Sequence, residues 1–206
     1  LAKSMVTTGN SLGMEVTAQV TEMDNPIGLM FGNSHEIVEC IQCLKGDGPE
    51  DTMQLVYAQA DSLGYDIRQN IADGSALAEF RNMCMRQGVS EEDIDEIIAN
   101  PWTKLERSSN SVDIVSKNSG WITDIHALTI GEILCKLGAG RTGENPDINH
   151  GVGAQLLVQR GSFIEEGTAW IRFDTESGMS SEMIDQVQGA LALSDSETKI
   201  SSRILQ

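Results

Sequence analysis

The sequence predicts an α/β protein in two parts, and three observations lead to this expectation. Residues 1–46 show the order helix, strand, loop and helix, which is typical of α/β domains. Residues 47–100 carry mostly helical periodicity. After a polar, aperiodic stretch at residues 104–110, short alternating runs surround few helices, which indicates an α+β domain. We therefore expect one part at residues 1–107 and a second at residues 108–206.

The first part begins with a predicted helix at residues 1–12. Gly13 ends it, since glycine adopts the left-handed conformation of a helix C-cap. Residues 14–21 alternate between apolar and polar side chains and predict a strand. A loop at residues 23–32 follows, because proline and glycine interrupt the pattern there.

A second predicted helix begins at Asn33. Asn33 is expected to cap it, with Glu36 three residues later completing a capping box, and Gly46 is expected to end it. His35 falls in the first turn, and we expect it to be solvated. Further helices are predicted to begin near Pro49, at Ser75 and at Ser90.

The second part is predicted to contain short strands around two helices. A turn at residues 118–120 is expected to join two strands as a hairpin. Thr129 and Glu132 form a capping box for a helix that stops at Gly138. The remaining predicted elements are strands at residues 112–115, 121–125, 156–158 and 169–173, and a helix at residues 181–193.

The charge excludes several classes of partner. A formal net charge of −17 repels phosphate backbones and anionic lipid, so we expect neither nucleic-acid nor membrane binding. The apolar runs fall short of the ~20 residues that a transmembrane helix needs. The chain starts at Leu1 inside a helical pattern, with no signal-peptide pattern, which predicts a part of a longer cytoplasmic protein.

The four cysteines are expected to be reduced. Cys40 and Cys43 are spaced like half of a zinc or redox motif, but a second pair is missing and both lie in a helical pattern. We therefore expect buried thiols in Cys40, Cys43, Cys84 and Cys135, which fits a reducing cytosol. The tryptophans are expected to pack, because no basic side chains alternate with them.

Three ordered stretches resemble the thymidine and pyrimidine-nucleoside phosphorylase family, and together they cover essentially the whole chain. The first runs from Leu1 to Val6 and continues with Gly9 and Leu12-Gly13. The second runs from Thr21 to Gly28 and continues with Gly32-Asn33, Glu36, Glu39 and Lys45-Gly46-Asp47-Gly48-Pro49. The third is Leu137-Gly138-Ala139-Gly140-Arg141, then Gly151-Val152-Gly153-Ala154 and Gly161, and it is most similar to animal members.

The resemblance implies a fold, a reaction and partners. Residues 1–107 would be the C-terminal part of a mixed α/β glycosyltransferase-type domain, and residues 108–206 a small, hammerhead-like α+β domain. The family is expected to be homodimeric and to require no organic cofactor. Its members reversibly convert a pyrimidine deoxynucleoside such as thymidine, with phosphate, to the free base and 2-deoxyribose 1-phosphate.

The chemistry needs a phosphate cradle and a clamp for the leaving base. In the family the cradle is a Lys-x-Ser-Gly segment with a later His-Thr-Gly-Gly-Thr segment, and the clamp is an Arg with a Ser and a Lys. Lys117-Asn118-Ser119-Gly120 matches only by letter, in a predicted turn without a helix after it. The loop after Leu137 is glycine-rich but follows a helix rather than opening one. We therefore assign no catalytic or substrate-binding residue to this chain.

A cation site is implied at the 23–32 loop. Bacterial members of the family hold a monovalent cation, potassium, with two backbone carbonyls of this loop and a Glu on the next helix. The matching positions are Ile27, Met30 and Glu39, and oxygen ligands suit a hard cation. Met30 replaces a small residue, and the other ligands of the family fall outside this chain. The alternative is that Glu39 is an ordinary helix-surface carboxylate.

Gly138, Gly140 and Arg141 form a predicted domain-closure loop that continues to His150. Gly138 ends the preceding helix, Gly140 lets the chain turn again, and Arg141 would meet another part of the enzyme when the domains close. The alternative is a structural turn.

Other functions remain open at this stage. The first is an anthranilate phosphoribosyltransferase-like enzyme, a family that lacks the second part. The second is a noncatalytic carrier or binding module, although the turn at residues 159–161 lacks the lysine that such carriers display. The third is a regulatory pseudoenzyme derived from the phosphorylase family.

Overall fold

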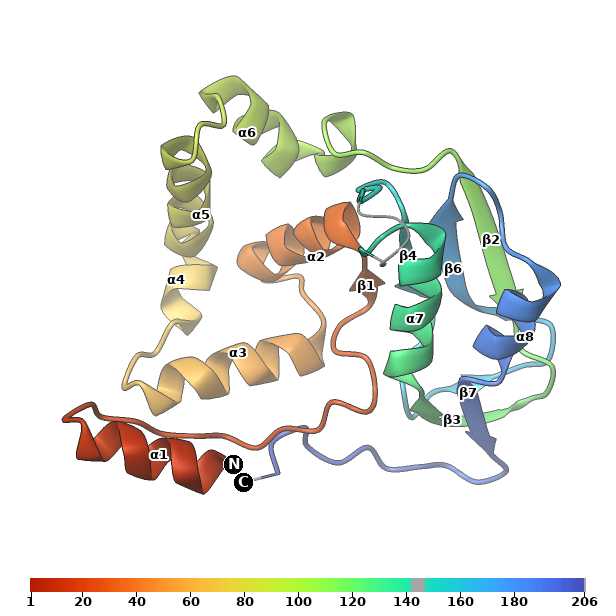
Figure 1. Cartoon of the computed structure of the whole chain (residues 1–206), viewed down its shortest axis with the longest axis horizontal. Coiled ribbons are helices and arrows are strands. Elements are labelled where there is room, and N and C mark those ends of the chain that lie inside the picture. The colour runs from red at the N-terminus through yellow and green to blue at the C-terminus, as the bar shows by residue number, and fades with distance from the viewer. Residues whose placement is uncertain (142–146, 206) are drawn as a thin grey trace.

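The computed structural model describes residues 1–141 and 147–205. The first hundred residues are mainly helical, and most strands lie in the remainder (Figure 1). The helices are α1 (Ala2–Ser11), α2 (Asn33–Lys45), α3 (Glu50–Ser62), α4 (Arg68–Ala72), α5 (Ser75–Arg86), α6 (Glu91–Ala99), α7 (Ala127–Leu137) and α8 (Ser181–Gln188), with a 3-10 turn at Pro101–Thr103. The strands are β1 (Met30–Phe31), β2 (Asn110–Val115), β3 (Gly120–Ile125), β4 (Gly153–Leu156), β5 (Phe163–Ile164), β6 (Ala169–Thr175) and β7 (Leu191–Ser194). The chain is therefore a mixed α/β protein.

Two antiparallel sheets organise these strands. One has the order β1-β4-β6-β2 and the other β5-β3-β7. In the first sheet, Met30 pairs with Gln155 and Phe31 with Ala154, so a short strand from the loop before α2 extends a sheet built otherwise from later residues. This pairing brings the 23–32 loop against the second half of the chain.

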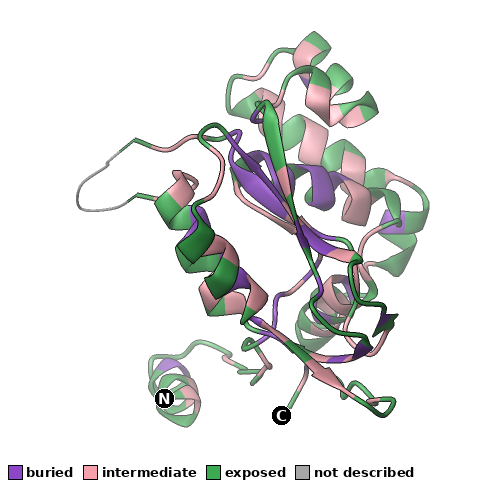
Figure 2. Cartoon of the chain, turned by 90° about the vertical axis from the view of Figure 1, so that its right-hand side faces the viewer, coloured by how far each residue is buried: buried purple, intermediate pink, exposed green. Residues whose placement is uncertain are grey.

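The main core lies between the first sheet and α7. Strand β6 contributes Trp170, Ile171 and Phe173, all fully buried, and α7 contributes Ile130 and Ile133. Figure 2 shows the buried residues concentrated on the strands and on the inner side of the adjoining helices. This core positions β4, and through it the loop that contains β1.

The helices before residue 100 form an arc to one side of the sheets (Figure 1). This arc buries few apolar side chains, and α5 has no buried residue. Its helix boundaries nevertheless follow local rules. Gly46 ends α2 in the left-handed conformation, and Ser90 caps α6 by accepting a hydrogen bond from the Asp93 N–H, both as predicted.

The strand predicted at residues 14–21 is wrong. Among the described residues, this segment makes only an isolated bridge, Thr21 with Ile204, rather than a ladder. Alternation alone does not produce a strand, because the backbone groups also need a neighbouring strand. The segment is extended instead.

Three other predictions need correction. Strands β2 and β3 do not form a hairpin, because β2 pairs with β6 whereas β3 pairs with β5 and β7. Helix α7 begins at Ala127, so Thr129 lies inside the helix and is not its N-cap. The Thr129 hydroxyl is hydrogen-bonded to the His126 ring instead. Helix α8 ends at Gln188, and the predicted end of that helix forms β7 instead. Local patterns misplaced these elements because pairing with distant strands decided them.

Amide hydrogen exchange should separate the two kinds of extended segment. The Leu156 and Leu157 amides donate to Leu29 and Trp170 carbonyls at 2.8 Å, so we expect them to exchange at least about 100-fold more slowly than residues 17–20. Each measured exchange rate is divided by the intrinsic rate of an unstructured peptide of the same sequence, so that protection rather than raw rate is compared. Equal protection in the two segments would contradict the absence of a ladder at residues 14–21.

Candidate functional site: the loop before helix α2

The Glu39 side chain holds the 23–32 loop from the α2 side. Its Oε1 accepts hydrogen bonds from the Leu29 N–H at 2.7 Å and the Met30 N–H at 3.2 Å. Gly28 has a φ of +74°, and a Cβ there would lie 2.1 Å from the Glu39 Oε2. Glu39 is only 8% exposed, so the alternative of a helix-surface carboxylate is wrong. The loop passes so close to Glu39 that residue 28 must be glycine.

The environment of Glu39 disfavours its charge on balance. Burial raises the pKa of this carboxyl, whereas the hydrogen bonds from the Leu29 and Met30 amides lower it. The nearby carboxylates of Asp51 and Glu36 raise the pKa further. A carboxylate in this setting gains from any additional positive charge or donor.

Asn25 fixes the other end of the loop to β3. Its side-chain Oδ1 accepts a hydrogen bond from the Ile125 N–H at 2.7 Å, and its Nδ2 donates to Glu22 and Asp124. The side chain is therefore committed to structure. The loop is held on one side by β3 and on the other by α2.

The three predicted cation ligands, Ile27, Met30 and Glu39, lie close together at the loop before α2. Met30 contacts Glu39 directly through its N–H, and Ile27 precedes Gly28, which touches the Glu39 carboxylate. Across the described parts of the chain, His, Cys, Asp and Glu side chains form no group of three or more that could hold a metal. Any cation at this loop would therefore depend largely on main-chain oxygens.

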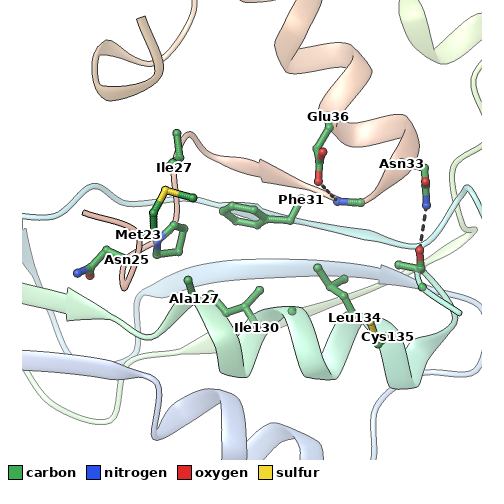
Figure 3. Close-up of a pocket in the computed structure, with 15 residues that line it drawn as sticks. Met23, Asn25, Ile27, Phe31, Asn33, Glu36, Ala127, Ile130, Leu134 and Cys135 are labelled. Carbon is green, nitrogen blue, oxygen red and sulfur yellow. Dashed lines mark hydrogen bonds between the residues drawn. The ribbon is translucent and has the colours of Figure 1, made fainter. Parts of the chain in front are cut away.

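A pocket of roughly 410 Å³ lies between this loop and α7 (Figure 3). Ile27 and Phe31 face it from the loop side, and Ala127, Ile130 and Leu134 face it from α7. The polar side chains at its edge are already engaged, since the Glu36 Oε1 accepts from the Gly32 N–H and Asn33 donates to the Ala139 carbonyl. The pocket therefore presents a largely apolar surface.

These two contacts revise the predicted start of α2. Gly32 is the N-cap, and Asn33 is the first helical residue without a capping hydrogen bond. Glu36 supplies the half of the capping box that reaches back to the N-cap amide. The Asn33 side chain is thereby free to bind the loop after α7.

The predicted closure loop lies beside the pocket. Gly138 ends α7 with a φ of +110°, as predicted. Gly140 lines the pocket, and a Cβ there would lie 2.6 Å from the Cys135 Sγ, so close packing rather than a left-handed turn requires glycine. Arg141 is exposed. Residues 142–146 of this predicted loop lie outside the described residues.

A buried polar cluster that the sequence analysis missed joins the two halves. His35, expected to be solvated, is 2% exposed, and its Nε2 lies 2.9 Å from the Asp174 Oδ2. The Arg107 Nε donates to the same oxygen at 2.6 Å, and the Ser111 Oγ donates to the Asp174 Oδ1 at 2.6 Å. Gly153 packs against the His35 ring, where a Cβ would lie 2.1 Å from Nδ1. Since His35 and Asp174 are 139 residues apart, no local spacing reveals them.

These donors determine the charge of Asp174. Burial opposes ionisation of this carboxyl, but hydrogen bonds from His35, Arg107 and Ser111 outweigh it and hold the pKa well below its usual range. Arg107 also lies over the Trp102 ring, 5.0 Å from its centroid. Asp174 therefore acts as an anionic centre that ties α2, β2 and the segment after the 3-10 turn to β6.

The remaining sequence motifs have structural roles. Lys117 is exposed and pairs with Asp185 at 3.5 Å, and the Ser119 hydroxyl accepts from the Glu166 N–H, which agrees with a turn. All four cysteines are free thiols, but Cys40 and Cys135 are exposed, so the expectation of burial is wrong for these two. Helix packing around the 33–45 pattern leaves Cys40 on the outer side. No helix in the described residues is both long and apolar enough to cross a membrane.

Asp174→Asn should lower the free energy of unfolding by about 2–4 kcal/mol at pH 7, because it removes the charge between His35 and Arg107. The folded-state pKa of Asp174 is lowered, so its stabilisation is present above the unfolded value of about 3.9 and is lost as the pH falls toward the folded value. The difference between the proteins, measured by urea unfolding, should therefore shrink below about pH 4.

Asp113→Asn is the matched control, because Asp113 is also hydrogen-bonded to an arginine, Arg172, but is much more exposed. We expect it to cost only about 0–1 kcal/mol. Equal losses in the two variants, or a loss at Asp174 that does not change with pH, would contradict the assigned role of Asp174.

Comparison with known proteins finds relatives of this chain. The family model named pyrimidine nucleoside phosphorylase C-terminal domain matches residues 121–194. Thymidine phosphorylase of Rattus norvegicus is 34% identical over 213 residues, covering 95% of this chain and 45% of the rat protein. The human thymidine phosphorylase is 31% identical, with 95% and 44% covered. Pyrimidine-nucleoside phosphorylase of Bacillus subtilis is 32% identical over 180 residues, covering 81% of this chain and 40% of that protein.

The chain thus spans less than half the length of these relatives. The match to the rat thymidine phosphorylase nevertheless covers 95% of this chain. The chain belongs to the thymidine and pyrimidine-nucleoside phosphorylase family and corresponds to the C-terminal part of its members.

Proposed function

We propose that this chain is the C-terminal portion of a thymidine phosphorylase, a pentosyltransferase that reversibly converts thymidine and phosphate to thymine and 2-deoxyribose 1-phosphate. The observation that carries this proposal is the match to thymidine phosphorylases over 95% of the chain. The complete enzyme would take phosphate and a pyrimidine deoxynucleoside, act in the cytoplasm and form a homodimer.

In this proposal the chain supplies framework rather than the reacting groups. The Lys-x-Ser-Gly match at residues 117–120 is a turn whose lysine pairs with Asp185, which supports leaving it out of the phosphate cradle. Several arginines are paired with carboxylates, which leaves them unsuited to clamp a leaving base; they are Arg68, Arg81, Arg172 and Arg203. The first part would complete the glycosyltransferase-type domain.

The loop held by Glu39 is the proposed site of a monovalent cation. A buried carboxylate with a raised pKa, beside a loop rich in main-chain oxygens, favours a nearby positive charge. Potassium would take carbonyl oxygens of Ile27 and Met30 and a Glu39 oxygen, with further ligands from the rest of the enzyme. No organic cofactor enters this proposal.

The turn containing Gly138, Gly140 and Arg141 is the proposed closure surface. Asn33 ties the Ala139 carbonyl to the start of α2, while Arg141 is exposed next to the apolar pocket. Arg141 would pair with an acidic group or carbonyl of the remaining enzyme when the domains close.

The isolated 206-residue chain should show no thymidine phosphorolysis, because cradle and clamp are assigned elsewhere in the complete enzyme. Release of 2-deoxyribose 1-phosphate from thymidine and phosphate is the measurement. The Bacillus subtilis pyrimidine-nucleoside phosphorylase is the positive control. Release above a protein-free blank would contradict the proposed division of roles.

Glu39→Gln should raise the potassium concentration needed for half-maximal activity of the complete enzyme by about tenfold, because an anionic ligand is lost while the amide oxygen can still accept from the loop. Glu36→Gln is the matched control, since Glu36 lies on the same helix but accepts from the Gly32 amide, whereas the Leu29 and Met30 amides donate to Glu39. An unchanged potassium response of Glu39→Gln would reject the cation site while leaving the phosphorylase assignment in place.

A further inference from the structure

The C-terminal segment returns to the first part of the chain. After β7 it runs back alongside the segment before the 23–32 loop (Figure 1). The Glu22 N–H donates to the Arg203 carbonyl at 2.8 Å, and the Leu205 N–H donates to the Val20 carbonyl at 2.8 Å. Thr21 and Ile204 form a bridge between these contacts. Two antiparallel stretches, nearly the length of the chain apart, thus hold each other in place.

The Arg203 side chain turns inward from this segment. It is 6% exposed although the residues around it in sequence are mostly exposed. Its Nε donates to the Asp51 Oδ2 at 2.9 Å, and its Nη2 lies 2.7 Å from the same oxygen as an ion pair. Nη1 donates to Glu22 at 2.9 Å. Both carboxylates are less exposed than ordinary surface ion pairs, at 22% for Glu22 and 33% for Asp51.

The same guanidinium binds the backbone of the loop. Nη1 donates to the Asn25 carbonyl at 3.2 Å, and Nη2 donates to the Pro26 carbonyl. Asp51, which Arg203 holds, in turn accepts from the Gly28 N–H at 3.3 Å. Arg203 therefore contacts the loop at two consecutive carbonyls and, through Asp51, at a third residue.

Charge explains why a cation is needed there. Glu22, Asp51 and Glu39 all approach the same short loop, and their mutual repulsion is not screened fully in a partly buried site. Arg160 also reaches Glu22, at 3.3 Å, but the carbonyl to which it donates is that of Thr123 in β3 rather than one of the loop. Only a planar, multidentate donor satisfies two carboxylates and two carbonyls from one position, which is a property of arginine rather than lysine.

We infer that Arg203 is the positioning residue of the loop at residues 25–30, and that its guanidinium is a built-in cation which fixes the loop through the Asn25 and Pro26 carbonyls and through Asp51. This role goes beyond the proposed phosphorolysis and does not depend on it. Potassium, if it binds beside Glu39, meets a loop that Arg203 has already shaped.

The test compares the wild-type chain with Arg203→Ala and Arg203→Lys by amide hydrogen exchange. The Gly28, Leu29 and Met30 amides should exchange about tenfold to 100-fold faster in Arg203→Ala, because the loop loses the guanidinium that binds the Asn25 and Pro26 carbonyls and holds Asp51, the acceptor of the Gly28 N–H. Arg203→Lys should recover only part of this protection, because lysine lacks the planar fork. Residues of β6 should keep their protection in every variant.

Arg172→Ala is the matched control. Arg172 also makes a two-pronged contact with a carboxylate, Asp113, but lies away from the loop. The Arg172→Ala variant should therefore leave amide exchange at residues 28–30 unchanged. The same loss of protection in Arg172→Ala and Arg203→Ala would mean a general loss of stability and would overturn the inference.

Chemical rescue distinguishes a positioning cation from a merely packed side chain. Guanidinium chloride at tens of millimolar, far below denaturing concentrations, should bind the vacated site in Arg203→Ala and restore slow exchange at residues 28–30. Wild type should not respond. Equal concentrations of potassium chloride control for ionic strength.

Three outcomes would overturn the inference. One is unchanged exchange at residues 28–30 in Arg203→Ala, and another is full protection in Arg203→Lys. The third is equal rescue by potassium and guanidinium, which would show that charge alone suffices. If Arg203→Ala loses protection in β6 as well, Arg203→Lys decides, because it keeps the charge and much of the volume while removing the fork.

Discussion

Buried carboxylates that collect donors from distant segments hold this chain together. Asp174 receives His35, Arg107 and Ser111, and Glu39 receives two amides of the loop before α2. A buried carboxylate is costly unless its lone pairs are satisfied, so each one constrains every segment that supplies a donor. In a protein with a net charge of −17, the buried basic side chains of His35 and Arg203 both lie against carboxylates, His35 at Asp174 and Arg203 between Glu22 and Asp51.

Local rules explain the elements that the sequence predicted well. Gly46 and Gly138 end α2 and α7 because a left-handed residue must follow each helix, and Ser90 caps α6 through its own hydroxyl. The errors arose where a partner far along the chain decides. The alternating residues 14–21 meet the C-terminal segment only at the Thr21–Ile204 bridge, whereas Met30 and Phe31, inside a predicted loop, pair with β4. The pattern of a segment does not reveal whether a neighbour exists.

The candidate site shows the same division. Family resemblance predicts Glu39 as a cation ligand, whereas the contact that the structure shows is with the loop N–H groups of Leu29 and Met30, which no sequence pattern indicates. Arg203 and the His35–Asp174 pair could not be predicted, because their partners lie more than a hundred residues away. A buried arginine in a polar, glycine-free stretch gives no periodic signal, and a histidine in a first helical turn resembles a solvated one.

These contacts also limit where the described chain can bend. A hinge needs a place that few interactions cross. The expected boundary at residues 107 and 108 is crossed by the β1–β4 pairing, by the Asp174 cluster and by Arg203, which reaches back from the last residues to Glu22 and Asp51. The three ties lie on different elements, so loosening one leaves the other two. Relative motion at this boundary would have to break a sheet and two ion-paired clusters together, and the two parts are therefore better regarded as one mechanical unit. Any closure of the proposed enzyme would then move this unit as a whole against the rest of the protein.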